Sequence, residues 1–175
     1  MKYKIKRVQF NSKNCFICGL ENEMGLRTRF YETEDNELIS LCYPKLKHQS
    51  YPSTLHGGVS AAILDETIGR AICAHYGDMV WGVTLDLNVK YRKPVPYDVE
   101  LKTVARITND RGRIFEGEGI LYLPNGEVAV EARGTYMKRQ VEQLGGPGFV
   151  GEEWGFTPEQ PIPETIEIPE PEAGK

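Results

Sequence analysis

Long hydrophobic runs and a secretory signal are absent from this sequence. No stretch approaches the roughly eighteen consecutive apolar residues that a membrane-spanning helix needs. The first residues, M-K-Y-K-I-K-R, contain neither an apolar run nor a small-residue cleavage site. Because the four cysteines occur without such a signal, a disulfide framework is not indicated. We therefore expect a soluble, cytoplasmic protein with reduced thiols and no membrane partner.

A strong charge of one sign is absent as well. The 175 residues carry a net charge of −4. Residues 140–175 contain eight Glu and one Lys, a charge of −7, which leaves +3 on residues 1–139. A charge of +3 is too small for a nucleic-acid-binding surface, although it suits a phosphorylated small ligand. No nucleic-acid partner is therefore expected.

The sequence does contain enough apolar residues for one packed domain, because 40% of them are hydrophobic and 10% are aromatic. Its alternating, turn-bounded segments predict a hairpin, one long helix and then four strands. This order predicts an α+β fold in which an antiparallel β-sheet curls round one long central helix. The ranges are Leu26–Glu32 and Glu37–Tyr43 for the hairpin, Leu55–Tyr76 for the helix, and Val80–Lys93, Asp98–Thr108, Arg113–Leu123 and Glu127–Lys138 for the strands.

The composition changes after residue 139. Six of the eleven prolines lie in residues 140–175, together with most of the acidic excess. We interpret residues 1–139 as the folded domain, opened by a basic, polar lead over residues 1–14 that could include a short helix. Residues 140–175 are interpreted as a Pro/Glu-rich acidic C-terminal tail that is partly disordered. Its aromatic residues predict that residues 149–156 dock on the core or on a partner subunit.

The predicted helix contains the most informative residues. From Leu55 to Tyr76, apolar and small residues occur all round the helical period, which is typical of a helix buried on nearly every side. Glu66 has Arg70 one turn later, so these two can form an ion pair. Asp65 has no such partner, and an unpaired carboxylate on an apolar stripe is a candidate acid/base or nucleophile. The alternative is a structural acid bonded to a backbone amide or a hydroxyl.

The start of the helix is the second candidate feature. Gly57 and Gly58 leave the first turn bare, so its free N–H groups can bind a carbonyl oxygen that gains negative charge. Ser53 or Thr54 is the expected N-cap. Gly57 and Asp65 are eight residues apart, or roughly 12 Å along a helix. Because both groups must come within about 3 Å of one reacting carbonyl, two antiparallel helices of a dimer are predicted to form each site together.

The strand that follows the helix alternates strictly from Val83 to Arg92. Successive side chains of a strand point to opposite faces, so this pattern predicts one apolar face and one polar face. The apolar face is Val83, Leu85, Leu87, Val89 and Tyr91, and the polar face is Thr84, Asp86, Asn88, Lys90 and Arg92.

Two cysteines near the N-terminus have the spacing of half a zinc site. They are Cys15 and Cys18, in C-F-I-C-G-L. A second half is missing, because the remaining cysteines and the nearby histidines are isolated in the sequence. Plain thiols are therefore favoured over a metal site.

The run H-G-G-V-S-A-A-I-L-D-E, followed by the strand V-T-L-D-L-N-V-K-Y-R-K-P, resembles the PaaI-type hotdog-fold acyl-CoA thioesterases. The likeness covers roughly Cys15 to Arg139, and C-F-I-C-G-L-E-N-E-M-G-L also resembles many bacterial members. H-G-G with an Asp nine residues after the His is a fairly specific signal here, because the strand order and a K-Y-x-x-P strand end accompany it. The resemblance implies a hotdog fold, homodimers or homotetramers, and hydrolysis of an acyl-CoA thioester without metal. No cofactor is implied, because coenzyme A is part of the substrate.

The resemblance also assigns roles to the helix residues. It implies that the backbone N–H of Gly57, with Gly58 beside it and His56 just before, polarises the thioester carbonyl. Asp65 takes the place of the carboxylate that activates water or attacks the carbonyl. His56 is favoured as a structural residue at the helix entry rather than as a general base, since the chemistry already has a carboxylate.

Residues outside the helix receive less specific roles. Thr84 matches a hydroxyl that helps to hold the water or the carboxylate, although an exposed threonine on a polar strand face needs no function. One branch of the family has a water-orienting amide where this chain has Ser50, so the neighbouring Gln49 is the candidate. Basic residues at the strand end can pair with the phosphates of coenzyme A or simply solvate the strand; they are Lys90, Arg92 and Lys93.

Three other functions are considered for the same fold. A binding module could sense or carry an acyl-CoA without turnover, and a thioesterase could act on acyl-carrier-protein substrates. An unpaired Asp65 favours an enzyme over a sensor. A hotdog dehydratase is disfavoured, because that branch has a His five residues after the Asp and this chain has Arg70 there.

Overall fold

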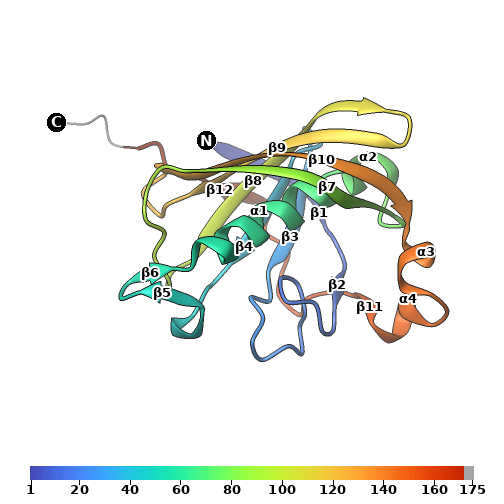
Figure 1. Ribbon diagram of the computed structural model, residues 1–175, viewed down its shortest axis with the longest axis horizontal. Coiled ribbons are helices and arrows are strands. Elements are labelled where there is room, and N and C mark those ends of the chain that lie inside the picture. Colours follow the sequence, from blue (N-terminus) through green and yellow to red (C-terminus); the bar gives the residue numbers. More distant parts are fainter. Residues whose placement is uncertain (172–175) are drawn as a thin grey trace.

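The computed structural model describes residues 1–171, in which eight strands form one antiparallel sheet that curls round helix α1 (Figure 1). The strands follow the order β12-β1-β3-β4-β8-β9-β10-β7 across the sheet. This arrangement confirms the predicted fold class, and the predicted hairpin is β3 and β4. The bounds are β1 Lys2–Val8, β3 Arg29–Thr33, β4 Leu38–Cys42, β7 Val80–Tyr91, β8 Leu101–Arg111, β9 Ile114–Tyr122, β10 Val128–Gln140, β12 Thr165–Glu167 and α1 Gly57–Arg70.

The smaller elements lie outside the main sheet. Strands β5 and β6 form a hairpin just before α1, and β2 pairs with β11 in a second small sheet. No helix within residues 1–171 has both the length and the apolar character of a membrane span. The bounds are β2 Asn11–Ser12, η1 Leu46–His48, β5 Gln49–Tyr51, β6 Thr54–Leu55, α2 Cys73–Tyr76, α3 Val141–Gly145, α4 Phe149–Glu152 and β11 Trp154–Phe156.

Glycines on β9 allow α1 to lie close to the sheet. Ile63, Leu64 and Ile68 of α1 are fully buried. A Cβ atom at Gly117 would lie 2.6 Å from Ile68 Cγ2, and one at Gly119 would lie 3.0 Å from Ile68 Cγ1. A side chain at Gly117 would clash with Ile68 and one at Gly119 would crowd it, so the two glycines let the helix approach the sheet closely. Each buried Leu or Ile side chain stabilises the fold by about 1.5–3 kcal/mol, and together they fix where the polar residues of α1 lie.

Helix α1 begins at Gly57, a few residues after the start that the predicted N-caps imply. Its N-cap is His56, whose Nδ1 accepts the N–H of Gly58 at 2.9 Å. The prediction of Ser53 or Thr54 as N-cap is wrong, because the residues before the helix form the β5–β6 hairpin instead. Ser53 lies in its turn with a φ of 64°, and Thr54 belongs to β6. The predicted helix is also divided, since α1 ends at Arg70 and α2 follows after a short break.

Both chain ends contribute strands to the main sheet. Residues 2–8 form β1 rather than a short helix. Thr165–Glu167 pairs with β1 and buries Ile166, and Ile168 is buried as well. The sequence interpretation described residues 140–175 as partly disordered and did not include this strand, in which apolar residues between prolines complete a sheet edge. Residues 172–175, the last part of the predicted disordered tail, lie outside the described residues, and the domain boundary at residue 139 stays a prediction.

The segment 149–156 docks on its own chain, which is one of the two predicted alternatives. Trp154 is buried on β11. Its ring makes edge-on contacts with Phe10 and Trp81, at centroid distances of 5.5 and 5.1 Å. Phe149 also packs edge-on against Trp81, at 5.8 Å. These aromatic contacts bring α4 and β11 to the start of β7 (Figure 1).

Strand β7 forms one edge of the sheet and contains a bulge. Within residues 1–171 it pairs only with β10, where Thr84 lies opposite Tyr136 but Asp86 lies opposite Thr135. Leu85 therefore has no partner residue on β10. After such an extra residue, the side chains that would have pointed to one face of the sheet point to the other face. The prediction of one uninterrupted alternation along this strand is wrong for this reason.

Because of the bulge, even-numbered residues before it and odd-numbered residues after it face α1. Thr84 lies before it and donates to Asp65, and Tyr91 lies after it and donates to the carbonyl of Gly57. Thr84 thus faces the helix rather than the predicted outer, polar face. Leu85, by contrast, is 52% exposed and does not share the buried face of the residues that follow.

Candidate active site

The carboxylate of Asp65 is held by two hydroxyl groups. It projects from the middle of α1 and is half-buried in the protomer. Its Oδ1 accepts hydrogen bonds from Thr84 Oγ1 at 2.8 Å and from Tyr136 OH at 3.1 Å. Within residues 1–171 it forms no ion pair, and its Oδ2 has no hydrogen-bond partner. One oxygen of the carboxylate is therefore fixed and the other is available to a ligand.

Tyr136 is a site residue that the sequence interpretation missed. Its side chain is buried on β10 and stacks on Phe115 with a centroid distance of 5.1 Å. Burial and then the charge of Asp65 raise the pKa of Tyr136 above its ordinary value, so its hydroxyl stays protonated and donates. The available signal was a large tyrosine on the alternating face of a strand, whose hydroxyl needs a partner when it is buried.

A cavity of about 360 Å³ adjoins Asp65. Its walls come from α1 and β7, and also from Cys15 in the N-terminal loop and Phe149 of α4. Trp81 and Phe149 give it an apolar side. Gly57 does not line this cavity, so the two halves of the predicted site are separate within one chain.

The backbone N–H of Gly57 is free at the start of α1. The next two N–H groups differ: that of Gly58 donates to His56 Nδ1, and that of Val59 donates to the carbonyl of His56. The N–H of Gly57 has no acceptor in the described chain. The expectation that Gly58 offers a second free N–H is therefore wrong, whereas His56 does shape the helix entry as its cap. Tyr91 OH holds the Gly57 carbonyl at 2.8 Å.

Gln49 lies at the Gly57 end of the helix, not at the Asp65 end. It is exposed on β5, opposite Leu55 in the β5–β6 hairpin. Its Oε1 accepts from Tyr97 OH at 3.4 Å, a long hydrogen bond. The predicted residues thus form two groups, one around Asp65 and one around Gly57.

The basic residues at the end of β7 lie away from the Asp65 cavity. Arg92 pairs with Glu131 at 2.8 Å and Lys93 pairs with Glu127, both at the exposed surface. Lys90 and Arg92 line a separate cavity of about 540 Å³. Because Tyr91 faces α1, its two neighbours point to the opposite face of the sheet.

The structure brings Cys15 and Cys18 together with Glu66. One ligand atom from each residue lies within 4.8 Å of the other two. Glu66 also makes the predicted ion pair with Arg70, at 2.7 Å. The sequence interpretation considered only cysteines and histidines as partners of this pair and favoured plain thiols, so it did not include Glu66. The sequence gave no signal for this contact, because Glu66 is 48 residues from Cys18 in the chain.

Known proteins share both the sequence pattern and the fold. Residues 53–130 match the sequence family described as the thioesterase superfamily. The acyl-coenzyme A thioesterase THEM4 of Rattus norvegicus is 33% identical over 96 residues, which are 54% of this chain and 40% of the rat protein. This chain therefore spans less than two thirds of that relative.

Two solved structures of similar fold are 25% identical in sequence. One is a thioesterase superfamily protein with a TM-score of 0.64, covering 70% of this chain and 59% of its own. The other, from Bacillus halodurans and solved with CoA, has a TM-score of 0.53 and covers 58% of this chain and 66% of its own. The PaaI-type branch stays a prediction. Residues 53–130 are therefore similar in sequence to the thioesterase superfamily, and the shared sheet-and-helix architecture shows that this chain has the hotdog fold.

Proposed function

We propose that this protein hydrolyses an acyl-CoA thioester to a free acid and coenzyme A. The proposal is supported by the family match over residues 53–130, by the name of the rat relative and by the CoA in the Bacillus halodurans structure. The single observation that carries it is how the Asp65 carboxylate is held. Its Oδ1 is fixed by two hydroxyl donors, while Oδ2 is free beside a cavity with an apolar wall.

In the proposed reaction, Asp65 acts as a general base. Oδ2 takes a proton from a water molecule as the water oxygen bonds to the thioester carbon. The carbonyl oxygen becomes an oxyanion, which accepts a hydrogen bond from the N–H of Gly57. The C–S bond then breaks, coenzyme A leaves as its thiolate, and the proton held by Asp65 returns to that thiolate or to solvent. Thr84 and Tyr136 keep the carboxylate aimed throughout.

The oxyanion donor is proposed to come from a second copy of this chain. Gly57 does not line the Asp65 cavity of its own chain, and the helix separates the two groups by roughly 12 Å. A partner is expected along β7, whose outer edge pairs with no strand in the described part of the chain. Val83, Leu85 and Tyr91 are 37%, 52% and 55% exposed there, and an unpaired edge with apolar side chains is suited to edge-to-edge pairing. A homodimer, or a homotetramer built from two dimers, would then contain composite sites.

The phosphates of coenzyme A are proposed to bind near Lys90, Arg92 and Lys93. Replacing Arg92 and Lys93 together by Ala should raise KM by about tenfold with a smaller change in kcat, because distant phosphate contacts contribute uniform binding. Steady-state kinetics with one acyl-CoA measures both constants. Lys2→Ala is the matched control, since Lys2 is also exposed and ion-paired, with Glu167, near the opposite sheet edge. A loss confined to kcat would remove Arg92 and Lys93 from the coenzyme site.

The function is tested by measuring free-thiol release from short, long and aromatic acyl-CoA substrates. At least one substrate is expected to be turned over catalytically, at a rate above a blank that contains the protein and its own four thiols. Tight acyl-CoA binding without release would favour the sensor alternative. Release only from acyl-carrier-protein thioesters would favour the second alternative, so a loaded carrier protein belongs in the same panel.

A further inference from the structure

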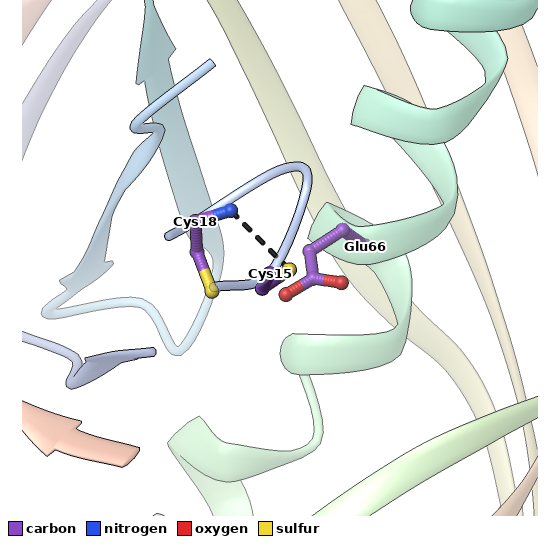
Figure 2. Close-up of side chains that lie close together, drawn as sticks. All are labelled: Cys15, Cys18 and Glu66. Carbon is purple, nitrogen blue, oxygen red and sulfur yellow. Dashed lines mark hydrogen bonds between the residues drawn. The ribbon is translucent and has the colours of Figure 1, made fainter. Parts of the chain in front are cut away.

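A second cluster of reactive side chains adjoins the Asp65 cavity. Cys15 and Cys18 lie on one tight loop, and the carboxylate of Glu66 comes toward them from α1 (Figure 2). One ligand atom of each residue lies within 4.8 Å of the other two. Two thiolates bound to a tetrahedral zinc ion at about 2.3 Å are separated by about 3.8 Å. The three groups can therefore close on one ion with movements of roughly 1 Å or less.

The loop directs two backbone N–H groups at one cysteine sulfur. The N–H of Cys18 points to Cys15 Sγ at 3.4 Å (Figure 2), and the N–H of Ile17 points to the same sulfur at 3.4 Å. Hydrogen bonds to sulfur favour its charged form, which is the form that binds metals. The hydrogen bond with Cys18 and burial nevertheless raise the pKa of the Cys15 thiol above its ordinary value, so an ion must displace its proton. The turn closes with the N–H of Gly19 on the carbonyl of Cys15, at 2.8 Å. A Cβ atom at Gly19 would lie 2.3 Å from that carbonyl oxygen, so the loop requires glycine there.

Arg70 orients the ligands from outside the cluster. Its Nε donates to Glu66 Oε1 at 2.7 Å, and its Nη2 donates to Cys18 Sγ at 3.1 Å. The carbonyl of Phe10 holds its remaining nitrogen at 2.8 Å. Within residues 1–171, Glu66 Oε2 accepts no hydrogen bond, so one oxygen is available to an ion. Outer contacts of this kind fix the geometry of metal ligands in many sites.

The charges of the cluster balance with a divalent ion present. Two thiolates and one carboxylate carry three negative charges, and Arg70 with a divalent cation supplies three positive charges. Balance is needed because Cys18 and Arg70 are 0% and 5% exposed, and unpaired buried charges are costly. The Glu66–Arg70 pair is neutral by itself, so the two further positive charges of the ion balance the two thiolates.

We propose that Cys15, Cys18 and Glu66 form a binding site for a divalent cation of the zinc class. Thiolate ligands select this class over magnesium or calcium. Cys15 and Glu66 also line the cavity, so the fourth coordination position opens toward water there. The ion replaces the two thiol protons, which are released on binding. It ties the N-terminal loop to α1, one residue from Asp65, and takes no part in the hydrolysis proposed above.

The test is metal binding by the reduced full-length protein after treatment with a chelator. Zinc titrated against a chromophoric competitor should bind at one ion per chain, and cobalt should give sulfur-to-metal charge-transfer absorption. Replacing both Cys15 and Cys18 by Ser should weaken binding by about 100-fold or more, since only one ligand remains. Glu66→Gln should weaken it by about tenfold or more, because the amide is a poorer ligand.

Cys42→Ser is the matched control, because Cys42 is a buried free thiol on β4, outside the cluster, and its loss should leave the stoichiometry unchanged. The single variant Cys15→Ser covers the case in which the double variant does not fold. Wild-type protein that binds no more zinc than the double variant would overturn the proposal. Loss of two free thiols in air without any zinc uptake would overturn it in favour of a disulfide-forming pair. The readout does not depend on thioester turnover, so it is separate from the proposed hydrolysis.

Discussion

Replacing Asp65 by Asn is expected to lower kcat by at least about 10²-fold, the usual loss when a general acid or base is removed. The amide oxygen of Asn can still accept from Thr84 and Tyr136, which bond only Oδ1 and the backbone of Asp65. The lost oxygen, Oδ2, has no partner within residues 1–171, so the fold should survive with a change in unfolding free energy of about 1 kcal/mol or less. Single-turnover and steady-state thiol release, with a thermal melt of each protein, measure these expectations.

The control for this substitution is Asp35→Asn, which makes the same chemical change in the exposed β3–β4 turn. It should leave both kcat and the melt unchanged. Wild-type turnover by Asp65→Asn would assign the base elsewhere. Glu66 and Glu153 are the other acids that line the cavity, but Glu66 Oε1 is held by Arg70 and Glu153 Oε2 by the amide of Asn14.

The elements of this fold follow local patterns and could be predicted. The hairpin, the central helix and the four long strands lie within a few residues of their predicted ranges, because hydrophobic periodicity and turn residues mark them. The bulge at Leu85 could not be predicted, since it depends on how β7 pairs with β10 rather than on β7 alone. The pairing of β12 with β1 escaped prediction for the same reason, because Thr165–Glu167 finds its partner at the other end of the chain.

The same distinction between local patterns and tertiary contacts applies to the candidate site. Asp65 and Gly57 stand out in the sequence because a charge and a pair of glycines interrupt a buried helix. Tyr136 and the contact of Glu66 with the cysteine pair were missed, because they join residues far apart in the chain. Local patterns thus identify groups that are out of place, whereas tertiary packing decides which groups meet them.

The composite site leads to the second large expected effect. Asp65→Asn and Gly57→Pro homodimers should both be nearly inactive, one for lack of the base and the other for lack of the N–H. If the two groups serve opposite carbonyls, a mixed dimer has both defects in one site and an intact second site. Mixed dimers should therefore regain up to half of the wild-type activity per dimer, measured after differently tagged chains are co-expressed and purified through both tags.

The structure indicates that Gly57→Pro can fold. Gly57 is the first helical residue, where proline is tolerated, and His56 before it has φ −62° and ψ 131°, the conformation that proline favours in its predecessor. The remaining risk is crowding, since a Cβ atom at Gly57 would lie 3.3 Å from the ring of Tyr91. Gly57→Ala is the matched control, because it adds the same Cβ atom and keeps the N–H. An active Gly57→Ala protein beside an inactive Gly57→Pro protein would assign the loss to the N–H. Well-folded mixed dimers that regain no activity, with Gly57→Ala active, would refute the cross-subunit arrangement and require Gly57 and Asp65 to act within one chain.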